Sequence, residues 1–288
     1  MPAATAATPV NACPLCGGHK FAARPRETGF INAPAGTRVE ECRRCGLCFL
    51  NPQPVVEYTK DYFDEFREKS DIAGGSTTLA GYLEHRLDRI GRIVGKGRLL
   101  EIGFAGALFL AEAARRGWEV WGVDVSRWAV EEAAAKYGFD KVFHGGLVQQ
   151  RFPDAHFDCV HMNHVIEHIP ELVQTVEELR RIIRPGGVVV LEVPNEFGTL
   201  QEPLRELVGV PRRPNELPSA HLWFFTPRTI ARLFESHGFK GLELRTTRRN
   251  KEPESRRFGG AFVKRLVYRA EELLDRAPMI EYWAGRRP

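Results

Sequence analysis

The sequence predicts an α/β fold, in which a mostly parallel sheet with helices on both faces follows a small cysteine-containing module. Two observations lead to this prediction. Two cysteine pairs lie within the first 48 of the 288 residues, and from residue 98 onward apolar strand-like runs alternate with helical patterns. Strands that alternate with helices over short turns form parallel sheets, because each helix carries the chain back across one face of the sheet.

The composition excludes several classes of protein. Hydrophobic residues make up 43% of the chain and charged residues 27%, which is typical of globular domains rather than of disordered chains. The net charge is 41 − 37 = +4, which is too small to require a nucleic-acid partner. The longest apolar runs are too short to span a bilayer. Residues 1–12 lack the features of an export signal and are expected to form a disordered lead-in, so we expect a cytoplasmic protein.

Two cysteine pairs indicate a metal site near the start of the chain. Their spacing is C-x2-C-x25-C-x2-C, formed by Cys13, Cys16, Cys42 and Cys45, and a glycine follows each pair. Such pairs can bring four thiolates to one tetrahedral zinc ion, and the glycines permit the tight turns that this needs. We therefore expect a structural Zn²⁺ in a module of residues 13–54. The alternatives are unrelated buried cysteines, or an iron–sulfur site that also uses Cys48.

The elements of the larger part follow from periodicity and from turn residues. Apolar residues recur at helical spacing over residues 79–94, and residues 55–97 are expected to be a helical linker and cover. Strands are expected at residues 98–102, 118–123, 141–144, 157–162, 188–193 and 279–284, and helices at residues 107–116, 127–137, 170–184 and 262–274. Ser126 and Gly138 are the expected caps of the second of these helices. Residues 197–220 contain four prolines and are expected to form an insertion that covers a substrate.

A loop of small residues after the strand at 98–102 indicates the cofactor. It contains Gly103, Phe104, Ala105 and Gly106, and it lets a ligand approach the backbone and the free N–H groups of the next helix. The G-x-G-x-x-G pattern of nicotinamide sites is absent, and Glu101 would repel a phosphate but suits a cationic amino acid. Asp124 lies 21 residues after Gly103, where a carboxylate can accept both hydroxyls of a ribose. Together these features describe S-adenosylmethionine (SAM) better than NAD. The alternative role for Asp124 is an acid at a helix N-terminus.

At this point residues 98–239 resemble the class I SAM-dependent methyltransferases, in particular ubiquinone-pathway-like and bacterial small-molecule members. The resemblance is carried by residues 101–107, by Asp124, by the sequence VIEHIP at 165–170 and by LRRIIRPGG at 179–187. It implies a Rossmann-like, mostly parallel seven-stranded sheet over residues 98–288, and a reaction that leaves S-adenosylhomocysteine. The cysteine module resembles the zinc-ribbon lead-in of some bacterial members.

The resemblance also implies which residues bind the cofactor. Glu101 and Gly103 would hold the methionine part, Asp124 the ribose, and Gly146 with Leu147 the adenine. The other residues expected in the SAM site are Phe104, Ala105, Gly106, Val125 and Asn163. Two features depart from the family pattern. Ala105 and Ala107 stand where the family usually has glycine, and no acidic residue follows Gly146.

Methyl transfer to a hydroxyl needs a group that removes the proton of the acceptor. His221 is the best candidate base and His164 the second, while residues 194–196 also reach the ligand-binding edge of the sheet. The alternative is that His221 packs against the next helix and that His164 is an ordinary loop residue. His164, Glu167 and His168 also spell H-x-x-E-H, a spacing that on a helix can bind a divalent metal. Structural hydrogen bonds are the alternative role for these three residues.

The expected acceptor is a small molecule, such as a sugar or a natural-product intermediate. The first alternative is an RNA methyltransferase that grips phosphates with the zinc ribbon and with a basic cluster, namely Arg245, Arg248, Arg249, Lys251, Arg256 and Arg257. The second alternative is a SAM-fold binding protein without catalysis. The sequence carries no signal for the oligomeric state.

Overall fold

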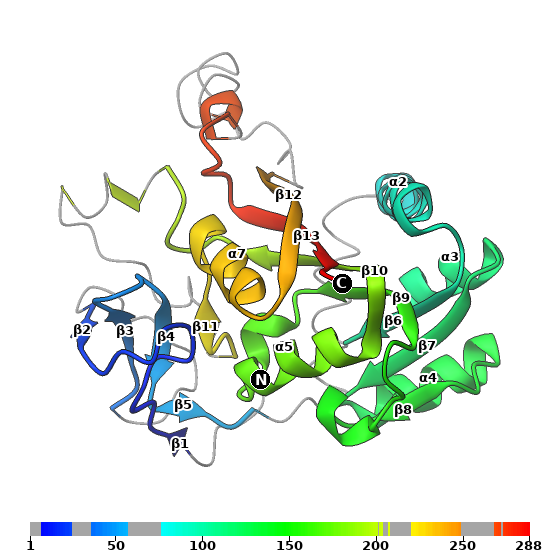
Figure 1. Cartoon of the computed structure of the whole chain (residues 1–288), viewed down its shortest axis with the longest axis horizontal. Helices are drawn as coiled ribbons and strands as arrows, with labels where there is room; N and C mark the ends of the chain where they lie inside the picture. Colours follow the sequence, from blue (N-terminus) through cyan, green and yellow to red (C-terminus); the bar gives the residue numbers. More distant parts are fainter. Residues whose placement is uncertain are drawn as a thin grey trace.

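A seven-stranded sheet organises the larger part of the protein (Figure 1). The computed structural model describes residues 7–24, 36–56, 76–200, 202–203, 207, 220–248, 268–271 and 273–288. The strands of the sheet are β6 (Arg98–Ile102), β7 (Glu119–Asp124), β8 (Val142–His144), β9 (Phe157–Asn163), β10 (Ile183–Pro194), β12 (Phe239–Thr247) and β13 (Met279–Arg286). Their order is β12-β13-β10-β9-β6-β7-β8.

The sheet is mostly parallel, as the sequence predicts. Strands β10, β9, β6, β7 and β8 pair in parallel, whereas β13 runs antiparallel to both β10 and β12. The carboxyl ends of the five parallel strands therefore lie along one edge. This is the edge at which open α/β sheets bind their ligands.

Alternating strand residues contribute side chains to two hydrophobic cores, one on each face of the sheet. Leu99 packs with α2 (Ser76–Val94), α3 (Leu108–Arg115) and α4 (Arg127–Tyr137). Leu100 packs with α5 (Leu172–Ile182) and α7 (Pro227–Ser236) on the opposite face. Fully burying a leucine contributes about 1.5–3 kcal/mol. Helix α2 thus belongs to the core of the larger part, although residues 57–75 of the expected linker and cover lie outside the described residues.

Helix α4 begins and ends at the expected caps, whereas α3 and α5 have ends that differ from the expected residues. In α4 the Ser126 Oγ accepts a hydrogen bond from the Ala129 N–H at 3.4 Å, and Gly138 ends the helix with φ 69°. Helix α3 begins one residue later than expected, because Ala107 is left-handed at φ 55°. Helix α5 ends at Ile182, since Ile183 is extended and already pairs with Phe157 of β9.

A second sheet joins the cysteine module to the larger part. Its strands are β2 (Phe21–Ala23), β3 (Arg38–Cys42), β4 (Cys48–Asn51) and β11 (Trp223–Phe224), in the order β11-β4-β3-β2. Strand β11 comes from the far part of the chain and lies beside the module in Figure 1. Leu47 and Phe49 of the module share one core with α5 and α7.

The expected disordered lead-in is ordered in part, which corrects that prediction. Strand β1 (Ala7–Thr8) pairs with β5 (Gln53–Pro54), and the Val10 N–H donates to Asn51 Oδ1 at 2.9 Å. The pairing partner lies more than 40 residues away, so composition alone gave no sign of it. Residues 1–6 lie outside the described part of the chain.

Three other expectations fall partly outside the described residues. Of the helix expected at 262–274, only residues 268–271 and 273–274 are described. In the insertion at 197–220, residues 201, 204–206 and 208–219 lie outside. In the basic cluster, Arg249, Lys251, Arg256 and Arg257 lie outside. Among the helices that the structure does describe, none combines the length and apolar character that a bilayer crossing needs.

Candidate active site and metal centre

The loop between β6 and α3 is shaped by left-handed backbone conformations. Gly103 has φ +68°, and a Cβ atom there would lie 2.5 Å from Val165 Cγ2, so only glycine fits. Ala105 and Ala107 are also left-handed, at φ 46° and 55°. An alanine in this conformation costs about 1 kcal/mol or more relative to its ordinary region. The two alanines that depart from the family pattern therefore occupy positions where glycine would be less strained.

Glu101 is buried beneath this loop. Its Oε1 lies 3.1 Å from His161 Nδ1, while its Oε2 has no hydrogen-bond partner within the described part of the chain. Burial raises the pKa of Glu101 well above its usual range, and the nearby charge of Asp124 adds to the rise. A buried carboxylate oxygen without a partner is costly. A cationic group, such as the ammonium of a bound amino acid, would satisfy it.

Asp124 at the end of β7 organises the same loop. Its Oδ2 accepts a hydrogen bond from the Ala105 N–H at 2.9 Å, and its Oδ1 accepts one from the Ser126 N–H at 2.8 Å. Burial raises the pKa of Asp124, although these two hydrogen bonds pull the pKa down. Each oxygen keeps a further lone pair for a ligand hydroxyl. Val125 follows with a side chain that is 52% exposed, at the outer rim of the site.

The loop after β8, the strand next to β7, is the loop expected to face adenine. Gly145 has φ 121°, a backbone conformation that favours glycine. The Gly146 N–H donates to Gln149 Oε1 at 3.0 Å. Leu147 is buried at the start of a short 3-10 helix, η1 (Leu147–Gln150). The loop therefore offers apolar surface and backbone groups rather than a charge.

Buried His221 and partly buried Glu196 form a pair beyond β10. His221 Nδ1 lies 2.6 Å from Glu196 Oε1. Burial lowers the pKa of His221, but the hydrogen bond to Glu196 and the charges of Glu196 and Glu167 outweigh it, so the net pKa is raised. An imidazole whose Nδ1–H is held by a carboxylate presents Nε2 as its proton acceptor. The sequence indicated His221 and residues 194–196 as site candidates, but it gave no indication that His221 pairs with Glu196, 25 positions away.

Glu167 and His168 lie against His221. Each of the three offers one ligand atom, and these atoms lie within 4.8 Å of one another. Neither carboxylate oxygen of Glu167 accepts a hydrogen bond from the described residues. Burial opposes ionisation of Glu167, yet the neighbouring histidines keep its pKa below the usual value. Burial and the charge of His221 lower the pKa of His168 to about 4, so His168 is a neutral ligand candidate whose Nδ1 faces Ala220 O at 2.8 Å.

The structure places the H-x-x-E-H residues differently from the helical metal site that this spacing can form. The motif does not lie on an α-helix, since Ile166–His168 forms only a short 3-10 helix, η2. His164 is left-handed at φ 56°. Its Nδ1 lies 3.5 Å from Glu167 Oε1 and its Nε2 lies 3.8 Å from Glu192 Oε1. The third member of the group is therefore His221 rather than His164. Asn163, half-buried at the end of β9, pairs in register with Glu192 of β10.

A buried ionic network underlies the site and was not expected from the sequence. Arg86 of α2 is 2% exposed, and its guanidinium lies 3.2 Å from His161 Nε2, 3.1 Å from Glu192 Oε2 and 3.3 Å from Glu281 Oε1. The network thus runs from Glu101 through His161 and Arg86 to the strand that precedes Glu196. Arg86 lies in an amphipathic helical pattern, and nothing in that pattern indicates that this arginine is buried in an ionic network.

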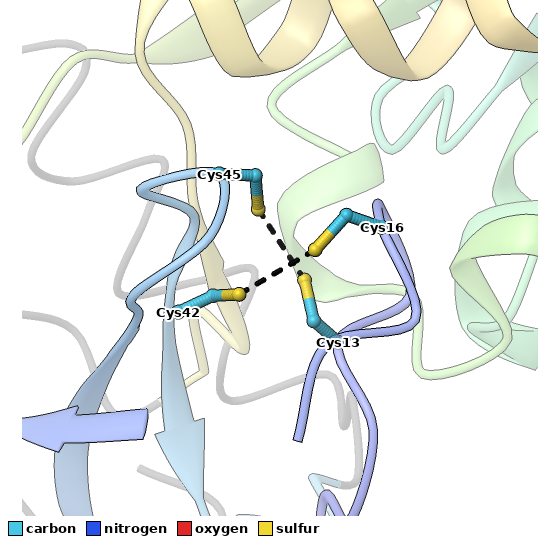
Figure 2. Close-up of side chains that lie close together, drawn as sticks. All are labelled: Cys13, Cys16, Cys42 and Cys45. Atoms are coloured by element: carbon cyan, nitrogen blue, oxygen red, sulfur yellow. Dashed lines mark hydrogen bonds between the residues drawn. The ribbon is translucent and has the colours of Figure 1, made fainter. Parts of the chain in front are cut away.

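The four predicted cysteine ligands converge on one point, as Figure 2 shows. Cys13 Sγ lies 3.5 Å from Cys45 Sγ, and Cys16 Sγ lies 3.5 Å from Cys42 Sγ, so neither pair is a disulfide. A tetrahedral zinc site with bonds of ~2.3 Å has sulfur–sulfur edges of ~3.8 Å. Gly17 and Gly46 adopt the left-handed turns, at φ 68° and 78°. The arrangement fits the donor set of a structural zinc ion.

Cys48 does not belong to this cluster. It is buried in β4, with its Sγ 3.8 Å from Gly46 O. Without a metal ion, burial raises the pKa of Cys45 to about 11, and a bound cation would reverse this effect. The geometry is that of one four-sulfur site within the described residues.

Comparison with known proteins places the larger part in a family. Residues 77–244, more than half of the chain, match the methyltransferase domain family, and the chain belongs to that family. It is 34% identical over 135 residues to a probable S-adenosylmethionine-dependent methyltransferase of Mycolicibacterium smegmatis, across 47% of this chain and 48% of that protein. It is 30% identical over 118 residues to a ubiquinone biosynthesis O-methyltransferase of Alkalilimnicola ehrlichii, across 38% and 48% respectively.

A solved structure shares the fold. The SAM-dependent methyltransferase from Archaeoglobus fulgidus is 22% identical, with a TM-score of 0.54 over 78% of this chain and all of that one. The chain spans about half the length of the two curated relatives named above. The family match shows that residues 77–244 form a methyltransferase domain, and the relatives that resemble it include a probable SAM-dependent methyltransferase.

Proposed function

We propose that the protein transfers a methyl group from SAM to a hydroxyl of a small molecule, such as a sugar or a natural-product intermediate. The observation that carries the proposal is the pair of buried His221 and partly buried Glu196, which follows the carboxyl edge of the sheet. Such a pair suits removal of a hydroxyl proton. The likeness to a ubiquinone biosynthesis O-methyltransferase supports an oxygen acceptor.

The residues of the β6–α3 loop and of the neighbouring strand ends would hold SAM. The unsatisfied Oε2 of Glu101 fits the ammonium of its methionine part, next to the backbone of Gly103, Phe104, Ala105 and Gly106. Asp124 would accept the ribose hydroxyls beside Val125, and Gly146 with Leu147 would cover the adenine. Asn163 lies at the end of the adjacent strand. When bound, SAM supplies an electrophilic methyl group on a positively charged sulfur.

His221 would act as the general base in an in-line displacement. Glu196 fixes the imidazole through Nδ1, so Nε2 takes the acceptor proton while the oxygen–carbon bond forms and the carbon–sulfur bond breaks. The neutral imidazole is the active form, and its population grows as the pH rises. Because the pKa of His221 is raised, this growth occurs at a higher pH than for an ordinary histidine. His164 is the second candidate base, and its partly exposed imidazole, 35% accessible, lies near the carboxylates of Glu167 and Glu192.

A His221 variant tests the base assignment. His221→Gln is expected to lower kcat by about 10²- to 10⁴-fold, with the Kd for SAM within about twofold of the wild type, because the SAM residues lie on other strand ends. His237→Gln is the matched control, since His237 bonds only at the end of α7, to Leu233 O and Ser236. Equal losses in the two variants, or a parallel loss of SAM binding, would contradict the assignment.

A divalent cation at Glu167, His168 and His221 is the second candidate role for the cluster. The observation that favours it is the buried carboxylate of Glu167, which accepts no well-formed hydrogen bond from the described residues and has His164 Nδ1 only at 3.5 Å. Two imidazoles and one carboxylate form a donor set typical of zinc and related ions. Activity that EDTA removes while the four-cysteine zinc stays bound, and that returns with one metal equivalent, would make His221 a ligand instead of a base. Unchanged activity in EDTA would exclude this role.

A small-molecule acceptor is favoured over RNA by the pairing of the described basic residues. The two described arginines of the basic cluster are engaged internally, Arg245 with Glu281 at 2.6 Å and Arg248 with Glu271 at 2.7 Å.

Labelling identifies the class of acceptor. Methyl-labelled SAM and the protein are incubated with a cell extract, which is then split into small-molecule, RNA and protein fractions. Label in the small-molecule fraction supports the proposal. Label that ribonuclease releases would instead assign an RNA acceptor.

The four-cysteine cluster is proposed to hold a structural Zn²⁺ in the module of residues 13–54. Its four sulfurs supply a complete tetrahedral donor set, which leaves no open position for catalysis. Elemental analysis is expected to find one zinc per chain, which Cys45→Ser loses and Cys48→Ser retains. Equal zinc in both variants would contradict this assignment.

A further inference from the structure

We propose that the four-cysteine module is a positioning element of the methyl-transfer site, because it holds the two segments that carry His221 and Glu196. The proposal rests on the proposed function, since that function makes this pair the catalytic one. Figure 1 shows the module packed beside α5 and α7, the helices on the same face of the sheet. Two independent sets of contacts cross from the module to the site.

The first set reaches the peptide that follows His221. The Leu50 N–H of β4 donates to Leu222 O at 3.0 Å, and Gln53 Nε2 lies 3.5 Å from the same oxygen. On its other side, the Leu222 N–H donates to Glu167 O at 2.8 Å. The backbone of Leu222 therefore bridges the module and the Glu167 segment, and it sets the position of His221 between them.

The short strand β11 continues this attachment. Trp223 pairs with Phe49, and Phe224 pairs with Cys48. The Trp223 Nε1–H donates to Ile169 O at 2.8 Å, and its ring lies 6.0 Å from the ring of buried Phe49. A strand of only two residues has little stability by itself. Its order, and with it the direction of the preceding His221, depends on the edge of β4.

The second set reaches the residue that follows Glu196. The Arg24 guanidinium lies 4.6 Å above the ring of Phe197, and a salt bridge of 2.8 Å to Glu41 of β3 holds Arg24 in place. Phe197 also packs edge-on against Phe224 of β11, at 5.1 Å between centroids. The module thus contacts both flanks of the pair, and these flanks contact each other.

The cysteine cluster controls the hairpin from which these contacts come. Cys42 is the last residue of β3, and Cys45 lies in the turn that leads to β4. The Cys42 N–H donates to Leu47 O at 2.9 Å, and the Gly46 N–H donates to Cys42 O at 2.8 Å. A metal ion bound to both cysteines closes this turn and fixes the register of β3 and β4. Loss of the metal is therefore transmitted to Leu222.

Hydrogen–deuterium exchange of the metal-loaded full-length chain tests this coupling without an acceptor. Cys45→Ser is expected to remove the metal and to speed exchange of the Leu222 amide by at least about tenfold, since the opening of a local unit sets that rate. Amides of β6, β7 and β9, and the Kd for SAM, are expected to stay within about twofold. Cys48→Ala, in the same module but outside the cluster, is the matched control. An unchanged Leu222 amide in metal-free Cys45→Ser would overturn the proposal, as would a parallel loss of SAM binding.

Arg24 provides a milder variant that keeps the metal. Arg24→Ala is expected to lower kcat by about fivefold, the size of one cation–π contact, with the KM for SAM unchanged and with partial recovery in Arg24→Lys. Arg38→Ala is the control, because Arg38 pairs with Glu40 in the same module. Unchanged kcat in Arg24→Ala would count against the proposal. If the wild type methylates no hydroxyl at all, the proposed function fails, while the exchange comparison still decides whether the module orders the Leu222 segment.

Discussion

Replacing Gly103 by alanine tests how tightly the cofactor loop is built. The left-handed backbone costs a non-glycine residue about 1–2 kcal/mol. The new Cβ would lie 2.5 Å from Val165 Cγ2, and overpacking of this kind costs about 1–3 kcal/mol. Reduced freedom of the unfolded chain returns about 0.4–1 kcal/mol. Gly103→Ala is therefore expected to lower the free energy of unfolding by about 2–3 kcal/mol.

The control for this variant lies three residues further along the same loop. Gly106 has no heavy atom within 4 Å of an added Cβ and no left-handed φ, so Gly106→Ala is expected to keep or slightly raise stability. Urea unfolding, followed by tryptophan fluorescence, measures both variants without SAM. Equal unfolding free energies for Gly103→Ala and the wild type would refute the reasoning. Calorimetric titration then measures the Kd for SAM in both variants. Gly106→Ala is expected to weaken SAM binding if SAM approaches the backbone there.

Three further predictions follow from the site. Ala105→Gly and Ala107→Gly relieve left-handed strain and are each expected to raise the free energy of unfolding by up to about 1 kcal/mol, whereas lower melting temperatures would contradict this. Glu196→Gln removes the charge that raises the pKa of His221. In a plot of kcat against pH, the acid limb of the Glu196→Gln variant is therefore expected to move to lower pH, and the plateau is expected to fall. An acid limb that stays in place would exclude His221 as the base. Arg86→Met removes the guanidinium that pairs with buried Glu192 and Glu281, although Arg245 still pairs with Glu281, and is expected to cost about 3–5 kcal/mol in chemical unfolding. Arg92→Met, on the exposed side of α2, is expected to cost little.

Features that depend on neighbouring residues were predictable from the sequence. Ser126 and Gly138 cap α4 as expected, because a cap acts on backbone groups within one turn. The two C-x2-C pairs form one cluster, since the spacing and the following glycines already prepare each half of the site. The alternation of strands and helices predicted the parallel sheet, because chain connectivity over short turns leaves few other arrangements.

Features that depend on distant parts of the chain were decided by the tertiary structure. The pairing of His221 with Glu196, the place of His221 in the Glu167 group and the burial of Arg86 all join residues from separate elements. The H-x-x-E-H spacing offered His164 as one possible metal ligand, whereas the segment is a short 3-10 helix and the ligand atoms that lie together are those of Glu167, His168 and His221.

The sequence by itself thus determined the fold class, the turn of small residues after β6 and the cysteine cluster, each through local geometry and periodicity. Only the tertiary structure decided which histidine meets which carboxylate, and that β11 extends the sheet of the cysteine module. The physical reason is that side-chain pairs across a core are selected by the packing of whole elements. No spacing within the chain encodes that packing.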